Sequence, residues 1–353
     1  MTEPETCRAA VFRTPGEPLC IEEFPIPELA SGEALVRVEC CTLCGSDLHS
    51  AFGHRPVPVP TILGHEIVGR VTGVASDQPP ADLAGTPLNI GDRVVWSVAA
   101  SCGQCDRCSR GMPQKCHQLF KYGHEKITDT HPLSGGLAEF CHLAPGTPVV
   151  RVDDELSDHE IAPVSCATAT VAEAMQSASS IAGRRVLIFG AGMLGLTAAA
   201  MARWIGASEV TVCDVDRDRL ERARDFGATS LLNWESVSSH SDSADVVFEL
   251  SGAAAAVQAA VGQLSIGGEL ILVGSVSPSD PVSIDPERIV RQLLRIRGVH
   301  NYTPGSLSRA VTFLSETEYP FGELVGRSFP LEEINEAITY AADSRACRVA
   351  IAP

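Results

Sequence analysis

The sequence predicts an α/β protein that combines a doubly wound parallel sheet with a separate β-rich domain. From about residue 160 onward, short apolar stretches alternate with helical patterns, which is typical of a parallel sheet covered on both faces. Before that point Pro and Gly are frequent, and short alternating runs at 34–39 and 67–74 indicate small strands joined by loops. Because 353 residues exceed what one hydrophobic core usually supports, we expect two domains.

The second half of the chain supplies the predicted parallel sheet. A helical pattern over 216–226 ends at Gly227, a residue typical of helix C-termini. Beyond Arg297 the chain becomes loop-rich, then shows another helical pattern over 331–343 and a last apolar run at 349–351. The predicted strands of the sheet are the four apolar stretches 186–189, 209–213, 245–250 and 269–273.

The composition restricts the class of partner. A formal charge of −17 argues against a general affinity for nucleic acid or anionic membranes, since both require a basic surface. Thirteen cysteines, an odd number, in a chain whose first residues show no apolar leader favour reduced thiols and a cytoplasmic location. The apolar stretch 186–202 has membrane-like length, but its three glycines and the following Arg203 fit a buried strand, turn and helix better.

A glycine-rich turn, Gly190-Ala191-Gly192-Met193-Leu194-Gly195, follows the first predicted strand and precedes a predicted helix. The first glycine permits a tight turn, the second lets a pyrophosphate approach the backbone, and the third allows close helix packing. With Asp214 ending the next strand, 19 residues beyond Gly195, the context predicts a Rossmann dinucleotide-binding domain. The alternative is a glycine-rich turn in an unrelated α/β fold.

Asp214 also bears on the choice of dinucleotide. Its carboxylate should accept hydrogen bonds from the adenosine ribose and repel a 2′-phosphate, which favours NAD over NADP. Arg217 and Arg219 could instead pair with a 2′-phosphate, or lie on a solvated helix face beside Asp216 and Asp218. We expect NAD, with Arg219 close to the cofactor.

Four cysteines with knuckle-like spacing form a compact lobe at about 100–117. Cys102, Cys105, Cys108 and Cys116 place four thiolates within fifteen residues, enough to enclose one zinc ion in a closed tetrahedral shell. An iron–sulfur cluster is the alternative, since four nearby thiolates also suit it. Redox iron has no evident purpose beside a hydride cofactor, so we expect a structural zinc.

Cys44, His65 and Cys166 are a second candidate metal site of a different kind. Three ligands from distant segments leave a fourth position for water or substrate, which chemistry at a metal requires. The alternative for Cys166 is a small buried side chain that packs a helix start. The remaining cysteines are interpreted as ordinary reduced thiols: Cys7, Cys20, Cys40, Cys41, Cys141, Cys213 and Cys347.

The order of these motifs resembles that of zinc-dependent medium-chain alcohol dehydrogenases over essentially the whole chain. The resemblance rests on Cys44-Gly45-Ser46-Asp47-Leu48-His49, Gly64-His65-Glu66, the cysteine lobe and the glycine-rich turn. It implies that Cys44, His65 and Cys166 hold a catalytic zinc. The implied domains are a GroES-like catalytic domain at 1–160 that includes the lobe, a Rossmann domain at 161–297, and a segment at 298–353 that returns to the catalytic domain.

The resemblance implies further roles near the catalytic zinc. Ser46 would hydrogen-bond the substrate hydroxyl, and His49 would pass its proton to solvent through the cofactor ribose. Asp47 would orient a zinc ligand, and Glu66 would support the metal from behind or briefly ligate it. Zinc would lower the pKa of the alcohol, and the alkoxide would give hydride to the nicotinamide. The alternative for His49 is a loop-capping role.

Several stretches are similar to a bacterial branch of the family that is associated with phosphonate catabolism. They are Cys41-Thr42-Leu43-Cys44 with Gly53-His54-Arg55-Pro56, Lys121-Tyr122-Gly123-His124-Glu125, and Cys166-Ala167-Thr168-Ala169-Thr170-Val171. Polyol dehydrogenases resemble the chain less, because an acidic ligand usually replaces the position aligned with Cys166. The resemblance suggests a hydroxyalkylphosphonate or a related anionic alcohol as substrate.

An anionic substrate needs charge-assisted donors, and the loops near the open site offer Arg55, Lys121 and His124. Arg55 and Lys121 could equally be solvated loop charges. Gly123-His124-Glu125 repeats the Gly-His-Glu triplet without a paired upstream cysteine, so we assign it no zinc. Two other functions stay open, a general neutral alcohol or polyol dehydrogenase and a non-catalytic dinucleotide-binding protein. We expect two zinc ions per chain, and the resemblance implies a homodimer or homotetramer.

Overall fold

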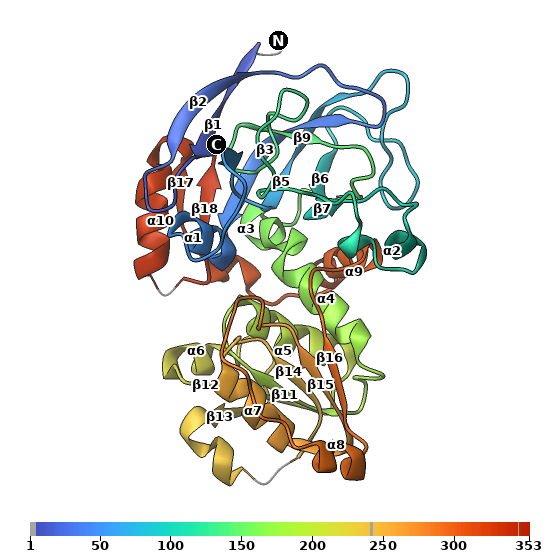
Figure 1. Ribbon diagram of the computed structural model, residues 1–353, viewed down its shortest axis with the longest axis vertical. Helices are drawn as coiled ribbons and strands as arrows, with labels where there is room; N and C mark the ends of the chain where they lie inside the picture. The colour runs from blue at the N-terminus through green and yellow to red at the C-terminus, as the bar shows by residue number, and fades with distance from the viewer. Residues whose placement is uncertain (1–4, 241–242, 345) are drawn as a thin grey trace. The chain divides into compact units, whose positions relative to one another are not determined.

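The structure, a computed structural model, describes residues 5–240, 243–344 and 346–353 (Figure 1). The chain forms two compact units. The first unit comprises the chain up to Cys166 together with Thr303–Ser315 and Phe321–Pro353, and the second comprises Ala167–Tyr302 and Glu316–Pro320. The first four residues, on which part of the expectation of no leader depended, lie outside the described residues.

The second unit contains the predicted parallel sheet. Its strands follow the order β13-β12-β11-β14-β15-β16, and every neighbouring pair is parallel. The chain order reverses between β11 and β14, which makes this point the topological switch of a doubly wound sheet. The strands are β11 (Arg185–Phe189), β12 (Glu209–Asp214), β13 (Ser230–Asn233), β14 (Ala244–Glu249), β15 (Leu264–Leu272) and β16 (Arg295–Gly298).

Burial explains why this apolar sequence forms strands. All residues of β11 after Arg185 are buried, as expected for a strand covered on both faces. Leu187, Phe189 and Val247 belong to one apolar core with residues of the flanking helices. The apolar stretch 186–202 is therefore β11, the glycine-rich turn and α5 (Met193–Ile205). Among the described residues, no helix has the length and hydropathy that crossing a bilayer requires.

Helices connect the strands of this sheet, and their ends follow the local sequence. α6 begins after Asp216, whose side chain accepts hydrogen bonds from the N–H groups two and three residues later. This helix is shorter than the predicted one over 216–226, because the chain continues from Arg222 to Gly227 in turns with i→i+3 hydrogen bonds. The helices are α4 (Ala167–Ser177), α5, α6 (Arg217–Arg222), the 3-10 helix η3 (Trp234–Ser239), α7 (Ala254–Gly262) and α8 (Pro286–Gln292).

The first unit is β-rich, as predicted. Its main sheet has the order β10-β6-β5-β3-β18-β17, with β9 also paired to β3. A three-stranded sheet, β2-β1-β4, and a two-stranded sheet, β7-β8, accompany it. The strands are β1 (Thr6–Phe12), β2 (Cys20–Pro25), β3 (Ala34–Leu43), β4 (Thr61–Ile62), β5 (Glu66–Val74), β6 (Arg93–Trp96), β7 (Ala99–Ala100), β8 (Phe120–Lys121), β9 (Phe140–Leu143), β10 (Val149–Arg151), β17 (Val325–Pro330) and β18 (Arg348–Ala352).

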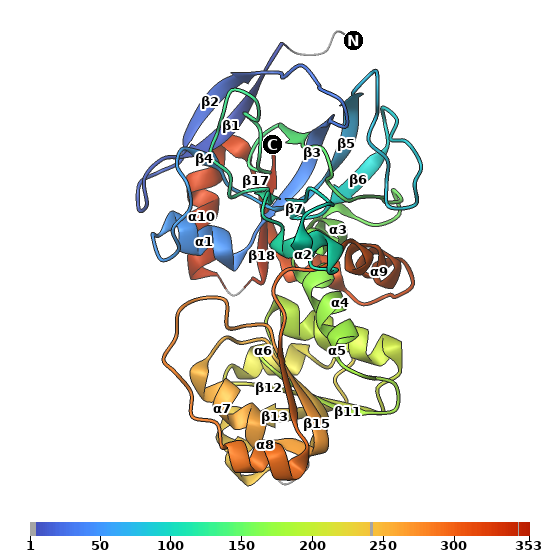
Figure 2. The ribbon, with the colours of Figure 1, turned by 45° about the vertical axis from the view of Figure 1, so that its right-hand side comes forward.

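The last strand, β18, lies between β3 and β17 in the main sheet. It runs antiparallel to β3, with Ala350 opposite Thr42, and parallel to β17. Figure 2 accordingly shows the red C-terminal β18 and α10 beside the blue α1 and β3. The helices of this unit are α1 (Gly45–Ala51), α2 (Asp106–Ser109), α3 (Asp158–Ile161), α9 (Pro304–Ser315), α10 (Ile334–Asp343) and the 3-10 helices η1 (Pro113–Lys115), η2 (Ala162–Ser165), η4 (Phe321–Leu324) and η5 (Leu331–Glu333).

Candidate metal centre and cofactor site

Three predicted ligands from distant segments meet in the first unit. Cys44 directly precedes α1, His65 lies between β4 and β5, and Cys166 follows the 3-10 helix η2. The candidate ligand atoms of these residues all lie within 4.8 Å of one another. His65 is buried and both cysteines are half-buried, so the three side chains are largely shielded from solvent.

Asp47 holds two of these three residues in place. Its Oδ1 lies 3.3 Å from His65 Nδ1 and accepts a 3.1 Å hydrogen bond from the Gly64 N–H. Its Oδ2 accepts a 2.9 Å bond from the Cys44 N–H. A carboxylate at Nδ1 leaves Nε2 of the imidazole as the ligand atom, and Ser46 Oγ lies 3.3 Å from that Nε2. The Ser46 hydroxyl therefore lies beside the imidazole nitrogen that would bind the ion.

A buried ion pair lies beside Cys44. Arg348 donates to both carboxylate oxygens of Glu66, at 2.6 and 2.8 Å, and Thr42 Oγ1 donates to the same carboxylate at 2.6 Å. A further contact joins Arg348 Nη2 to Cys44 Sγ at 3.6 Å. Both oxygens of Glu66 are therefore engaged by Arg348, and the guanidinium also faces the thiolate.

The electrostatics of the three candidate ligands suit a cation. The Cys166 thiol donates to Cys44 and, together with Arg348, holds the pKa of Cys44 well below its usual range despite burial. The same hydrogen bond, reinforced by burial, raises the pKa of Cys166. Although burial opposes it, Asp47 raises the pKa of His65 to about 10. The site therefore stabilises the Cys44 thiolate, which accepts a hydrogen bond from the Cys166 thiol. A bound cation would replace the proton of that thiol.

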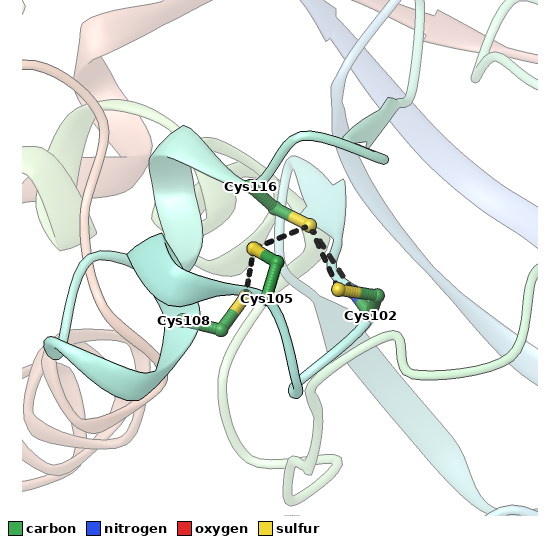
Figure 3. A group of neighbouring side chains, drawn as sticks. All are labelled: Cys102, Cys105, Cys108 and Cys116. Carbon is green, nitrogen blue, oxygen red and sulfur yellow. Dashed lines mark hydrogen bonds between the residues drawn. The ribbon is translucent and has the colours of Figure 1, made fainter.

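The four cysteines of the lobe point toward one another (Figure 3). Their Sγ atoms are separated by 3.5 Å for Cys105 and Cys108, 3.9 Å for Cys105 and Cys116, and 3.4 Å for Cys116 and Cys102. A tetrahedral zinc ion with Zn–S bonds of about 2.3 Å needs thiolates about 3.8 Å apart. The spacing of the four sulfur atoms therefore fits one ion at their centre.

Backbone amides of the same short segment favour thiolates at Cys102 and Cys105, whereas burial, and secondly Cys105, raises the pKa of Cys108 to about 12. Cys116 Sγ accepts hydrogen bonds from the N–H groups of Cys102 and Gln118, both at 3.3 Å. The N–H of His117, followed by that of Cys108, lowers the pKa of Cys105 to about 6. Because these donors all lie within residues 102–118, the lobe is built almost entirely by contiguous sequence.

Two loops of the first unit bear the predicted substrate residues. Arg55 follows α1, and its N–H donates to the His49 carbonyl at 3.0 Å, while Lys121 ends β8. Both side chains are half-buried, and among the described residues no carboxylate lies within ion-pair distance of either. Burial, and secondly the Arg55 charge, lowers the pKa of Lys121. The two cations therefore lie close enough to repel each other.

His124, from the second Gly-His-Glu triplet, lies against the candidate ligand His65. The ring centroids are 5.1 Å apart, and His124 Nδ1 donates to the Tyr122 carbonyl at 2.9 Å. Gly64 and Gly123 have φ values of 89° and 73°, and a side chain at Gly123 would place its first carbon 2.6 Å from the Gly64 carbonyl oxygen. Only glycines permit this approach, which brings the two histidines together.

The glycine-rich turn of the second unit has the geometry that its sequence predicts. Gly190 adopts a φ of 101°, and a side chain on Gly195 would place its first carbon 1.7 Å from the Gly190 carbonyl oxygen. Asp214, at the end of β12, accepts hydrogen bonds from the Ala191 N–H at 2.6 Å and the Asp216 N–H at 2.8 Å. Its carboxylate is therefore fixed beside the turn.

Two predicted residues are less constrained. His49 is exposed on α1, with its ring centroid 5.8 Å from that of His54. Arg219 is exposed on α6, where only its backbone N–H is bonded, to Asp216. Within the described parts of the chain, neither side chain forms a hydrogen bond or ion pair. The predicted roles of His49 and Arg219 would involve contacts to a bound cofactor or substrate.

Comparison with known proteins identifies the family. Residues 30–154 match the model of the alcohol dehydrogenase GroES-like domain, and residues 194–316 match that of the zinc-binding dehydrogenases. An alcohol dehydrogenase of Geobacillus stearothermophilus is 32% identical over 343 residues, which cover 93% of this chain and 94% of that protein. The chain belongs to the zinc-dependent alcohol dehydrogenase family.

Further members of this family are similar along almost their whole length. The D-altritol 5-dehydrogenase of Agrobacterium fabrum is 31% identical over 326 residues, covering 89% of this chain and 90% of that protein. A crystal structure of an alcohol dehydrogenase from Thermotoga maritima superposes with a TM-score of 0.93 at 30% identity and covers 99% of each chain. The predicted fold class, a Rossmann domain with a GroES-like domain, is confirmed, and the protein is an oxidoreductase.

At the candidate metal centre, Arg348 is a residue that the sequence did not predict. It is a single charged residue at the start of an apolar run, and no motif surrounds it. The one available signal is that an arginine beginning a buried strand needs a buried anionic partner. Identifying Glu66 as that partner requires the pairing of β18 with β3, which no local pattern reveals.

Proposed function

We propose that this protein is a zinc- and NAD-dependent alcohol dehydrogenase that oxidises a small anionic alcohol, with a hydroxyalkylphosphonate as the leading candidate, to an aldehyde or ketone. The observation that supports this most directly is the convergence of Cys44, His65 and Cys166 with the Ser46 hydroxyl beside them. Three ligands would leave a zinc ion one open position, and the Ser46 hydroxyl, 3.3 Å from His65 Nε2, would be available to a group bound there.

The donor set fits a catalytic zinc. Two thiolates and one imidazole are ligands that zinc prefers, and the site already stabilises one thiolate. When bound, the ion would act as a Lewis acid and make a substrate hydroxyl more acidic. Ser46 would accept the hydroxyl proton, and the exposed His49 would pass it to solvent. Asp47 would keep Nε2 of the imidazole directed at the ion.

The lobe supports a second, structural zinc, giving two ions per chain. Sulfur atoms 3.4 to 3.9 Å apart match a single tetrahedral ion. In an iron–sulfur cluster the four thiolates would bind different irons and lie farther apart, so the spacing favours zinc. Four protein ligands leave no open position, and the ion would therefore stabilise the loop without taking part in the reaction.

The second unit supports NAD as the cofactor. Gly190, Gly192 and Gly195 leave the backbone open to a pyrophosphate, with Met193 and Leu194 at the helix start, and Asp214 lies ready to accept from ribose hydroxyls. The bound dinucleotide would supply the hydride acceptor. NADP is the less favoured alternative, in which Arg217 or Arg219 would turn toward a 2′-phosphate. Asp214 opposes it by charge repulsion.

Arg55 and Lys121 support an anionic substrate. In a chain of net charge −17, two half-buried cations beside a metal site and without a carboxylate partner among the described residues are unusual. Their mutual repulsion and partial desolvation would be relieved by an anion lying between them. The lone pair of His124 Nε2, left free because Nδ1 donates to Tyr122, could accept from a protonated oxygen of a phosphonate.

Two other functions remain as alternatives. A neutral alcohol or polyol substrate is favoured by the similarity to D-altritol 5-dehydrogenase, and in that case Arg55 and Lys121 would be ordinary solvated loop charges. A non-catalytic dinucleotide-binding protein would have no need of the Ser46 hydroxyl beside the candidate ligands. We further propose a cytoplasmic homodimer or homotetramer, supported by thirteen free cysteines and by β16, which is an edge strand of the second unit's sheet as far as the chain is described.

The proposal is tested by NADH absorbance over matched alcohols, with zinc counted in the same preparation. Each neutral alcohol is paired with its phosphonate and its carboxylate analogue. We expect two zinc ions per chain, turnover with NAD in preference to NADP, and the highest kcat/KM for a phosphonate. Turnover of neutral alcohols alone would establish the polyol or neutral-alcohol alternative. Tight NAD binding without turnover of any alcohol would establish the non-catalytic one.

A further inference from the structure

The second unit contains a buried acidic residue that no motif explains. Glu249 ends β14 and is fully buried. Its Oε1 accepts three hydrogen bonds, from the Ser251 N–H at 2.8 Å, the Ser251 hydroxyl at 2.6 Å and the Gly252 N–H at 2.9 Å. Its Oε2 is buried and has no hydrogen-bond partner within the described part of the chain. Oε1 therefore acts as an acceptor toward all three donors.

Within the described residues, no cationic side chain pairs with this carboxylate. Among the described residues, no Lys, Arg or His lies within 4.0 Å of Glu249. The opposite end of the same strand differs, because Asp245 accepts from Arg185 Nη2 at 3.2 Å and from the Arg185 N–H at 3.0 Å. A buried acid without a counter-ion destabilises the folded protein, so its presence indicates a functional role.

The position of Glu249 in the sheet suggests what it faces. β14 lies at the switch point beside β11, and Glu249 is paired with Phe189, the residue before the glycine-rich turn. In a doubly wound sheet the dinucleotide lies across the carboxyl ends of the strands. The half that contains β11, β12 and Asp214 takes the adenosine mononucleotide, so the half that begins with β14 takes the nicotinamide mononucleotide.

The backbone around Glu249 gives its charge a fixed place. The Glu249 carbonyl accepts from the N–H groups of Val273 and Gly274 at 3.0 and 2.9 Å, and its side chain holds the Ser251–Gly252 turn. A side chain at Gly190 would place its first carbon 3.1 Å from the Ser251 N. The carboxylate therefore lies among the turns that border the nicotinamide half of the crevice, and it cannot swing away to solvent.

We propose that Glu249 supplies a fixed negative charge that shifts dinucleotide binding toward NAD⁺ relative to NADH. This inference rests on the proposed function, because it requires a nicotinamide dinucleotide in the second unit. The oxidised nicotinamide ring carries a positive charge that the reduced ring lacks, so a buried carboxylate stabilises only the oxidised form. At an effective dielectric constant of about 20, an opposite unit charge changes a binding ratio about tenfold if it lies within about 12 Å, and this sets the size of the effect to test. Such a preference would help the enzyme hold NAD⁺ against competing NADH during alcohol oxidation.

The test measures dissociation constants of NADH, by its fluorescence, and of NAD⁺, by competition, on the zinc-loaded full chain. Glu249→Gln keeps the size and the acceptor oxygen but removes the charge. We expect the ratio of the NAD⁺ constant to the NADH constant to rise about tenfold. Glu249→Asp keeps the charge and should leave the ratio within about twofold, even if both constants rise. Asp245→Asn, on the same strand but beside Arg185, is the matched control and should also leave the ratio unchanged.

Equal changes of both constants in Glu249→Gln would reduce Glu249 to a structural role and overturn the inference. A tenfold change of the ratio in Glu249→Asp or in Asp245→Asn would overturn it as well. The Asp variant keeps the proposal testable if the Gln variant does not fold. If the wild-type protein binds neither form of the dinucleotide, the proposed function itself fails, which is a separate result.

Discussion

The four-cysteine lobe and the Cys44–His65–Cys166 site use the same ligand chemistry but are built in opposite ways. The lobe takes all four sulfur atoms from one stretch of fifteen residues, and the N–H groups that support them lie in that stretch or within two residues of its end. The open site takes its three ligands from segments up to 122 residues apart, as 166 − 44 shows, and its buried ion pair from a residue 304 positions beyond Cys44. A closed shell can be made locally, whereas an open coordination position needs a fold around it.

Loss of an open-site ligand should produce the largest effect. Cys166→Ser is expected to lower kcat by roughly a thousandfold or more, because Lewis-acid stabilisation is worth several kcal/mol. Metal analysis should find one zinc ion per chain instead of two, while the lobe stays loaded. Cys213→Ser, at a buried cysteine of the second unit, is the control and should keep both ions and full turnover. Normal activity in Cys166→Ser would show that the third ligand is assigned wrongly.

Loss of a lobe ligand should affect stability more than chemistry. Cys105→Ser is expected to release the structural ion and lower the free energy of unfolding by several kcal/mol. The surviving folded fraction should keep its catalytic zinc and its kcat, since no lobe sulfur belongs to the open site. Thermal unfolding with and without a chelator measures the first effect, and turnover per remaining zinc measures the second. A proportional loss of kcat per catalytic zinc would contradict the division of roles.

The ion pair behind the open site should be intermediate in effect. Arg348→Leu removes the partner of the buried Glu66 carboxylate and the contact to Cys44, so we expect zinc affinity to fall by roughly 10- to 100-fold. Competition with a chromogenic chelator measures this. The paired variant Arg348→Leu with Glu66→Gln should recover stability, because no unpaired charge is then left buried, but should not recover zinc affinity. Full recovery of affinity would show that Arg348 serves only to neutralise Glu66.

Arg55 and Lys121, the two half-buried cations, should give the next smaller effect, which concerns only the open site. Arg55→Ala is expected to lower kcat/KM for a phosphonate alcohol by roughly tenfold, the value of one charge-assisted pair, and to leave a neutral alcohol nearly unchanged. Arg37→Ala, at an exposed position of β3, serves as a charge-matched control. Equal losses for neutral and anionic substrates would remove the assignment of Arg55 to substrate binding.

The smallest effect expected is a pH dependence of the same pair. Burial, and secondly Arg55, lowers the pKa of Lys121, so this amine loses its charge at a lower pH than an ordinary lysine. KM for an anionic substrate should therefore rise as the pH increases toward the usual lysine range, and Arg55→Ala should move that rise to higher pH. In the same window the folded state binds fewer protons than the unfolded state, so this group makes stability increase with pH. Initial-rate profiles with anionic and neutral alcohols separate the two effects.

The difference between the lobe and the open site also explains which features the sequence predicts. Short-range patterns predicted the parallel sheet, the glycine-rich turn and the lobe, because strand, turn and cysteine spacing are properties of contiguous residues. The open-site ligands came from a family resemblance, since nothing in their spacing brings Cys44 to Cys166. The predicted helix over 216–226 was too long, because its last turn continues in i→i+3 bonds before Gly227.

Two charged residues could not be predicted at all. Arg348 reaches Glu66 only through the register of β18 on β3. That Glu249 has no counter-ion among the described residues becomes evident only once the surrounding side chains are placed. Both are single residues outside any motif, and each depends on pairings between distant strands. Sequence patterns reflect interactions between residues that are close in the chain, whereas a buried charge is balanced by residues that are close in space.

The register of β18 also sets an order of events during synthesis. Cys44, His65 and Glu66 emerge from the ribosome long before Arg348, which follows Cys44 by 304 residues. Until β18 takes its place between β3 and β17, Glu66 has no guanidinium partner and could itself compete for a metal ion. The lobe, finished once Cys116 is made, is free of this delay. A nascent chain should therefore acquire its structural ion first and complete its reactive centre only after the final strand has docked.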